Sequence, residues 1–254
     1  MTQGAPHTGF NTSRLLRTLA AMVAEPLAES KQPFAERLGQ WLDFADALSL
    51  YAALNTPLQA DNTVARSGPA ASAREDLVRV REALSESITT DGILKPGKAR
   101  VELPTPAPKA SVEDAADFAP YHRYYAAHQR DMNAVIGPLR ARVRAILSQC
   151  CPRLAQLAEL DALMDQALAA RERSLLATVP TLLGKRFETL FAAHQAAMPD
   201  APAADDPQRW MQRGGWLAVF CKDMQAVLLA ELALRLQPVA GLIAALDNEV
   251  TTQQ

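Results

Sequence analysis

Two heptad stripes constrain the fold of this chain more than any other feature of its sequence. Their positions alternate steps of four and three residues, the spacing that keeps one side of a helix facing a neighbouring helix over several turns. The first stripe comprises Phe34, Leu38, Trp41, Ala45, Leu48 and Ala52, and the second comprises Tyr121, Tyr125, His128, Met132, Val135 and Leu139. Each stripe predicts a packed helix, and large residues of one could interlock with small residues of the other inside a bundle.

The composition also favours helices. The chain has 254 residues and is 49% hydrophobic, and much of this apolar content is Ala and Leu, whose unbranched side chains lose little rotamer freedom in a helix. We therefore expect an all-α fold, an irregular bundle of about seven to eight helices joined by proline-rich linkers. The 26 basic and 28 acidic residues give a net charge of −2, which is too balanced to indicate a nucleic-acid or membrane-surface protein by itself.

A third core helix is predicted over residues 217–236, where apolar side chains surround most of the circumference. Pro238 is expected to end it and to leave a short helix over residues 239–246. No transmembrane segment is expected here, because charged residues interrupt the apolar run at Lys222, Asp223, Glu231 and Arg235.

Proline and glycine divide the chain into three parts. Residues 90–119 contain Gly92, Pro96, Gly97, Pro104, Pro106 and Pro108, which predicts an extended linker between a helical segment at 1–89 and a helical bundle at 120–254. The two helical parts are expected to fold as one cooperative unit. Within the first part, residues 55–71 are interpreted as a flexible connection, and Ser72 with Glu75 matches a capping box that starts the next helix.

No sequence pattern indicates catalysis or a cofactor. Gly92, Gly97 and Lys98 match the spacing of a phosphate loop, but Ala99 replaces its magnesium-binding Ser or Thr, and a proline-rich stretch replaces the helix that should follow. The histidines and acids do not share the spacing of a helical metal site, and no nucleophile elbow occurs. We therefore expect a protein without enzymatic activity, metal or cofactor.

His128 and the three cysteines leave alternatives open. His128 lies on the second stripe, where it is either a core histidine or a pH-sensitive contact or metal ligand. Cys150 and Cys151 are adjacent and Cys221 is distant, so they form no disulfide framework. Ordinary packing is the favoured role for the adjacent pair, with a reactive thiol or a metal ligand as the alternative. This cysteine usage favours a reducing, cytoplasmic location.

A cluster of arginines provides the candidate binding residues. Residues 121–153 carry six arginines against Asp131 alone, whereas residues 154–206 carry eight acids against four bases. Adjacent antiparallel helices of opposite charge attract, so complementarity within the chain is the plain interpretation. The alternative is a surface for nucleic acid or an acidic protein, formed by Arg123, Arg130, Arg140, Arg142 and Arg144.

Several blocks of the sequence resemble an uncharacterised bacterial family, domain of unknown function 3348. These blocks are residues 8–13, 33–48, 117–121, 137–143 and 234–242. The resemblance implies no activity and no catalytic residues. Members of this family tend to be encoded near membrane proteins and OmpA-like envelope proteins, which implies an accessory role and partners associated with the envelope.

Two functions are expected on these grounds. The first is a non-enzymatic interaction or scaffold protein that binds a protein partner, in a membrane-associated envelope complex. The second is nucleic-acid binding through the arginine-rich helix at residues 120–149. The identity of the partner and the oligomeric state do not follow from the sequence.

Overall fold

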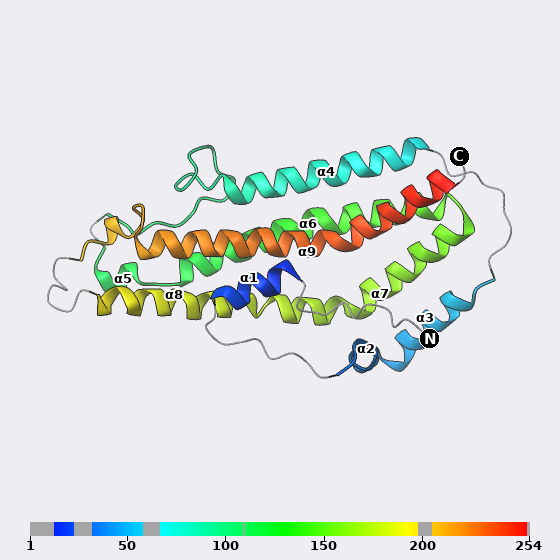
Figure 1. Cartoon of the computed structure of the whole chain (residues 1–254), viewed down its shortest axis with the longest axis horizontal. Helices are drawn as coiled ribbons and strands as arrows, with labels where there is room; N and C mark the ends of the chain where they lie inside the picture. Colours follow the sequence, from blue (N-terminus) through cyan, green and yellow to red (C-terminus); the bar gives the residue numbers. More distant parts are fainter. Residues whose placement is uncertain (1–12, 23–31, 58–66, 109, 198–204, 253–254) are drawn as a thin grey trace, which may run out of the picture. The chain divides into compact units, whose positions relative to one another are not determined.

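The structure, a computed structural model, describes residues 13–22, 32–57, 67–108, 110–197 and 205–252 (Figure 1). These residues form helices and connecting segments but no strand, which confirms the predicted all-α fold. The helices are α1 (Arg14–Met22), α2 (Phe34–Trp41), α3 (Phe44–Asn55), α4 (Ser67–Thr89), α5 (Val112–Ala115), α6 (Ala119–Ser148), α7 (Pro152–Leu176), α8 (Val179–Ala196), the 3-10 turn η3 (Pro207–Arg209) and α9 (Trp216–Thr252).

The chain forms two compact units, and each is discontinuous in sequence. Unit 1 comprises residues 1–29, 86–128 and 180–234, and unit 2 comprises residues 30–85, 129–179 and 235–254. Helices α4, α6 and α9 are divided between both units, and α8 lies in unit 1 apart from its first residue, Val179. The units do not follow the predicted boundaries at residues 89 and 119, and the expectation that the two helical parts fold as one cooperative unit stays a prediction.

Aromatic rings fill the core of unit 1. The ring of Phe187 on α8 is almost fully buried, and its centroid lies 5.0 to 5.7 Å from four other rings. These rings belong to Phe118, Tyr121, Trp216 and Phe220. Tilted and edge-to-face contacts of this kind add to the hydrophobic stabilisation of the core, so α6, α8 and the start of α9 are fixed to one another inside this unit.

A buried hydrogen bond connects α6 to α9 in the same unit. Glu231 on α9 is fully buried and accepts a 2.6 Å hydrogen bond from the hydroxyl of Tyr125. Tyr125 belongs to the second heptad stripe, whose residues are buried apart from the half-buried Val135. The prediction that this stripe packs in the core is confirmed.

The Gly214 and Gly215 pair forms the turn into α9. Gly214 adopts a positive φ of 89°, and a Cβ on Gly215 would lie 2.2 Å from the carbonyl oxygen of Trp210. Both positions therefore require glycine for backbone reasons. This turn places the buried ring of Trp210 5.1 Å from the ring of Trp216. The two glycines that follow Arg213 are therefore needed for the packing of this turn.

The first heptad stripe does not form one packed helix, so that prediction is wrong. The chain breaks after α2 because Leu42 is extended and Asp43 begins a new helix, where its carboxylate accepts a 2.7 Å hydrogen bond from the backbone N–H of Asp46. An N-cap of this kind accepts a hydrogen bond from a backbone N–H of the first turn, which has no partner within the helix. The later stripe residues, Ala45, Leu48 and Ala52, are exposed.

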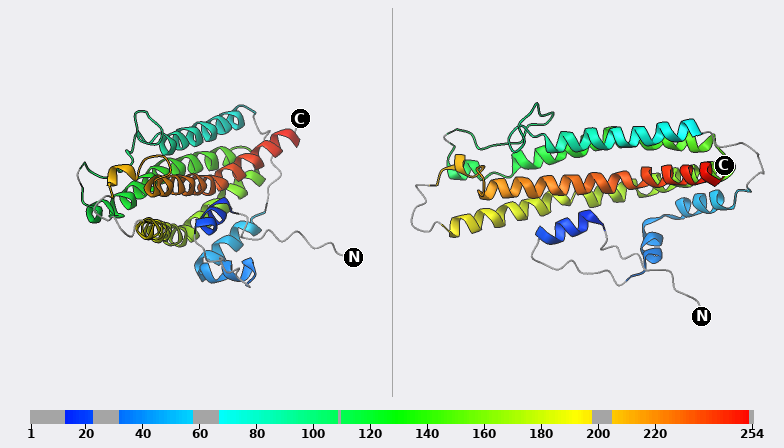
Figure 2. Two further views of the ribbon diagram at one scale, coloured as in Figure 1. Left: turned by 60° about the vertical axis from the view of Figure 1, so that its left-hand side comes forward. Right: turned by 45° about the horizontal axis from the view of Figure 1, so that its top comes forward.

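Both short helices pack against α7 in unit 2 (Figures 1 and 2). Trp41 at the end of α2 lies between two guanidinium groups, with Arg37 5.2 Å and Arg171 of α7 5.4 Å from its ring centroid. Ala53 of α3 is buried, and its carbonyl accepts a 2.8 Å hydrogen bond from the side chain of Gln156 on α7. Helix α7 is therefore the neighbour of the two helices that carry the first stripe, in place of the predicted second stripe.

Two helix boundaries also differ from the predictions, both at a proline. Helix α4 begins at Ser67, so the proposed capping box at Ser72 lies inside it, because Pro69 fits the first turn of a helix. Residues 58–66 of the predicted flexible connection lie outside the described residues. Helix α9 continues through Pro238 to Thr252, since burial of Val239, Leu242, Ile243 and Leu246 outweighs the loss of one backbone hydrogen bond.

Helix α9 is long and apolar enough to cross a membrane by length and composition alone, and it is the one such helix in the described part of the chain. Half of its most apolar window is buried inside the structure. The core helix of a bundle meets the same criterion, and α9 has this role in unit 1, where its residues Leu217, Phe220, Met224 and Leu228 are fully buried.

Candidate interaction surfaces

Two of the candidate arginines form an ion-pair network inside unit 2. Arg140 of α6 makes hydrogen bonds of 2.6 and 2.8 Å to Asp161 and of 2.7 Å to Asp165, both on α7. Arg144, one turn further along α6, approaches Asp165 at 3.1 Å and Asp161 at 3.4 Å. The side chains of the two arginines are only 15% and 19% exposed, so most of their surface faces the protein.

The spacing of the four residues explains this network. Each pair is separated by four positions, so both arginines lie on one side of α6 and both aspartates lie on one side of α7. Burial alone would lower the pKa of Arg140, but its hydrogen bonds to Asp161 and the charges of both aspartates outweigh burial and raise that pKa. The structure agrees with charge complementarity within the chain, which was the plain interpretation of the sequence.

The other three candidate arginines have different surroundings. Arg142 forms an ion pair with Asp76 of α4, which is buried and also contacts Arg79 at 3.1 Å. Arg123 and Arg130 are exposed. The structure therefore does not gather the five arginines into one open basic surface, since three of them bind aspartates.

His128 lies in the core of unit 1. Its ring is 2% exposed and stands edge-on to the ring of Tyr124, with 4.6 Å between the centroids. The ring is therefore buried among core side chains, and its role as a core histidine, a pH-sensitive contact or a metal ligand stays a prediction.

Two of the three cysteines occupy packed positions, and Cys151 is half-buried. Cys150 and Cys221 are buried, and burial raises the pKa of both thiols, with the charge of Asp91 adding to the effect at Cys221. Thiols with raised pKa values stay protonated at neutral pH and are poor nucleophiles and ligands. No cluster of three potential metal ligands occurs among the described residues.

The segment that matches phosphate-loop spacing already holds an anion of the chain itself. The carboxylate of Asp91, which is 1% exposed, accepts hydrogen bonds from the backbone N–H groups of Ile93, Leu94 and Lys95 at 2.8, 2.7 and 3.2 Å. Gly92 turns the chain with a positive φ of 83°. These N–H groups are the kind that bind phosphate in a true phosphate loop, so the loop serves a structural purpose here.

Replacing Asp91 by alanine is expected to lower the free energy of unfolding by about 2 kcal/mol, because three backbone donors lose a charged acceptor. Urea denaturation followed by circular dichroism measures this change. Asp91→Asn keeps one acceptor oxygen and should lose less, and Glu102→Ala, at an exposed residue of the same segment, should change little. Equal stability of the alanine variant and the unchanged protein would contradict this role.

Helix α3 presents large apolar side chains to solvent on the side that does not face α7. Phe44 is 85% exposed, Leu48 57%, Tyr51 66% and Leu54 62%. The first three follow steps of four and three residues and Leu54 follows after three more, so the four side chains form one stripe, here called the α3 face. Isolated exposed apolar residues are common, whereas a contiguous stripe of this size is typical of a binding surface.

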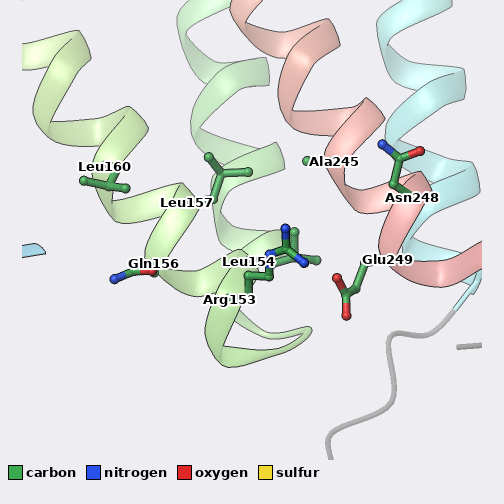
Figure 3. A pocket seen from close by; sticks show the side chains of 8 residues that line it. All are labelled: Arg153, Leu154, Gln156, Leu157, Leu160, Ala245, Asn248 and Glu249. Carbon is green, nitrogen blue, oxygen red and sulfur yellow. The ribbon is translucent and has the colours of Figure 1, made fainter. Parts of the chain in front are cut away.

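A cleft of about 370 Å³ lies between α7 and the end of α9 in unit 2 (Figure 3). Figure 3 shows Leu154 and Leu157 of α7 and Ala245 of α9 along it, with Arg153 and Glu249 at its edge. Half of its eight lining residues are aliphatic, and the others are two amides and one side chain of each charge, so it presents no group of converging catalytic residues.

A family model described as a protein of unknown function (DUF3348) matches residues 1–248. The chain belongs to this family. The resemblance seen in the separate sequence blocks is thereby confirmed and extends over the middle of the chain. None of the curated proteins and none of the solved structures with which the chain was compared matches it.

In this DUF3348 chain the α3 face is the feature that sequence reasoning placed wrongly. Leu48 belonged to the first stripe and was assigned to the core, while Phe44, Tyr51 and Leu54 were not singled out. The signal was present in Asp43, since an aspartate followed by a helical segment predicts a helix start. A helix break at Asp43 turns the stripe residues that follow it to a different side from the stripe residues that precede it.

Proposed function

We propose that this protein is a non-enzymatic interaction protein of the scaffold or accessory kind, and that the α3 face is its docking surface. The observation that carries the proposal is the exposure of four large apolar side chains on a helix whose opposite side is fixed to α7. Covering a water-exposed apolar stripe with a second apolar surface lowers the free energy, because it removes apolar area from water. A membrane-associated envelope complex is the setting that the family resemblance suggests for this role.

The arginines support this proposal over nucleic-acid binding. Phosphate contacts need basic side chains that are free to release counterions. Three of the five candidates are engaged with Asp76, Asp161 and Asp165, so nucleic acid would have to compete with internal ion pairs.

Affinity capture of the tagged chain from the cells that naturally produce it tests the proposal. A protein in stoichiometric amount, either another copy of the chain or a different protein, is expected with the unchanged chain and is expected to be lost with Leu48→Asp. Val78→Asp is the matched control, because Val78 is also an exposed apolar residue, 47% exposed, but lies on α4. Absence of any stoichiometric protein with the unchanged chain, or equal capture by Leu48→Asp, would refute the proposal.

A further inference from the structure

We infer that the α3 face binds a second copy of this chain, so that two α3 helices pack antiparallel in a symmetric dimer. This inference rests on the proposed function and names the partner of the same surface. It follows from the order of side chains along α3, the position of its charges, the small residues beside the stripe and the apolar area available.

The order of the side chains makes the α3 face complementary to itself. From the N-terminal end the stripe carries an aromatic, an aliphatic, an aromatic and an aliphatic residue: Phe44, Leu48, Tyr51 and Leu54. An antiparallel copy reverses this order, so that Phe44 lies opposite Leu54 of the second copy and Leu48 lies opposite Tyr51. Each ring then packs on an aliphatic side chain, and residue i contacts j while j contacts i, as a two-fold axis requires.

The charges of α3 favour the antiparallel arrangement over the parallel one. Asp43 and Asp46 lie at the N-terminal end, and no basic residue occurs between Phe44 and Asn55. A parallel pair would bring the four carboxylates together at one end, where they repel each other. In an antiparallel pair a helix of this length separates the two acidic ends by roughly 18 Å, which exceeds the Debye length of about 8 Å at physiological ionic strength.

The same charges disfavour a lipid surface as the occupant. Helices that lie on membranes carry Lys and Arg beside their apolar face, because these residues attract anionic headgroups. The α3 helix carries acidic residues and no basic residue, so an anionic bilayer would repel its N-terminal end. A second copy of the chain presents the same uncharged apolar stripe, so it suits the α3 face better than an anionic bilayer does.

Small residues beside the stripe allow two α3 helices to approach. Ala45 and Ala52 are exposed and flank the stripe beside Leu48, given a rotation of about 100° per residue along the helix. Short side chains at such positions permit the interaxial distances of about 8–10 Å that packed helices need.

The area of the α3 face suits a dimer of modest affinity. Fully buried aromatic side chains cover about 150–250 Å² each, so two partly exposed rings and two leucines provide roughly 500 Å² per copy. Two copies then bury on the order of 1,000 Å², the lower bound for a specific interface. A dimer of this size is expected to dissociate in the micromolar range or above.

Sedimentation equilibrium of the purified full chain over a series reaching high micromolar concentrations tests the inference. The unchanged chain is expected to fit a monomer–dimer equilibrium. Leu48→Asp and Tyr51→Asp should each weaken the dimer at least tenfold, because each places two carboxylates in the apolar contact, and Val78→Asp should leave it unchanged. Circular dichroism and thermal unfolding verify that the variants fold, which their exposed positions favour.

Engineered cysteines test the orientation in a Cys151→Ser background. Leu48 lies in the stripe and within about two residues of the expected two-fold axis, so Leu48→Cys should form an intermolecular disulfide under mild oxidation. Ala45→Cys should not, because the antiparallel arrangement places the two copies of this residue far apart. A disulfide at Ala45→Cys as efficient as that at Leu48→Cys would overturn the antiparallel arrangement.

Other outcomes overturn the inference in distinguishable ways. A strictly monomeric chain at the highest concentration, or a dimer unaffected by Leu48→Asp, refutes the second copy as occupant. If that monomeric chain still captures a different protein through Leu48, the proposed function stands and this inference alone fails. Leu48-dependent sedimentation of the monomer with phosphatidylglycerol vesicles would assign the face to a lipid surface and overturn both.

Discussion

Replacing Arg140 by alanine is expected to lower the free energy of unfolding by about 3 kcal/mol, because it leaves Asp161 and Asp165 with only the longer contacts to Arg144. Breaking a largely buried ion pair by removing one partner is among the costliest single changes in a protein. Urea denaturation at neutral pH, with the slope of the transition compared between variants, measures the loss.

Arg123→Ala is the matched control for this experiment, since Arg123 is an exposed arginine on the same helix. Its removal should change the stability by less than about 0.5 kcal/mol. A double-mutant cycle of Arg140→Ala with Asp161→Ala should give a coupling energy of at least about 1 kcal/mol, since the two side chains share two hydrogen bonds. Additive effects of the two substitutions would show that the interaction between Arg140 and Asp161 does not stabilise the folded protein.

Replacing Phe187 by alanine is expected to cost about 3–5 kcal/mol, because it leaves a cavity at the centre of the aromatic core of unit 1. The side chain is 2% exposed and contacts rings from α6 and α9. Thermal and urea unfolding measure the loss, and the near-ultraviolet circular dichroism of Trp216, whose ring lies 5.0 Å away, should weaken as well.

Phe187→Leu serves as the graded control, since leucine refills part of the cavity and should recover more than half of the lost stability. Phe44→Ala is the opposite control, because Phe44 is 85% exposed and its loss should leave the stability of the isolated chain nearly unchanged. A loss below about 1 kcal/mol for Phe187→Ala would mean that the surrounding rings collapse into the space.

The helices that sequence analysis predicted well share strong local signals. The second stripe runs without a break through α6, and its residues are spaced so that one side of that helix faces the core. The opposite charges of α6 and α7 also predicted their pairing, because short connections place consecutive helices side by side.

The interaction surface could not be predicted in the same way. Heptad spacing continues through Leu42 and Asp43, so periodicity alone favours one helix where the chain forms two. Which side of α3 is covered depends on α7, whose residue Gln156 binds the carbonyl of Ala53 about one hundred positions away. Apolar periodicity shows that a helix has a preferred side, but only the tertiary contacts decide which of its apolar residues reach solvent.

The internal aspartates were missed for a related reason. Asp76 pairs with Arg142 and Asp91 binds the backbone that follows it, and both residues lie in a stretch that looks polar and solvent-exposed in the sequence. The cue for Asp91 was its position just before Gly92, since aspartate often binds the backbone two residues ahead at a glycine turn.

The discontinuity of unit 2 has a consequence for the order in which the protein matures during synthesis. Arg74 on α4 makes two 2.8 Å hydrogen bonds to Asp247 on α9, across 173 positions of sequence. This contact can close only after residue 247 has left the ribosome, whereas α2 and α3 emerge early. Contacts of such long sequence separation form slowly, so the nascent chain exposes the α3 face before the rest of its unit is complete.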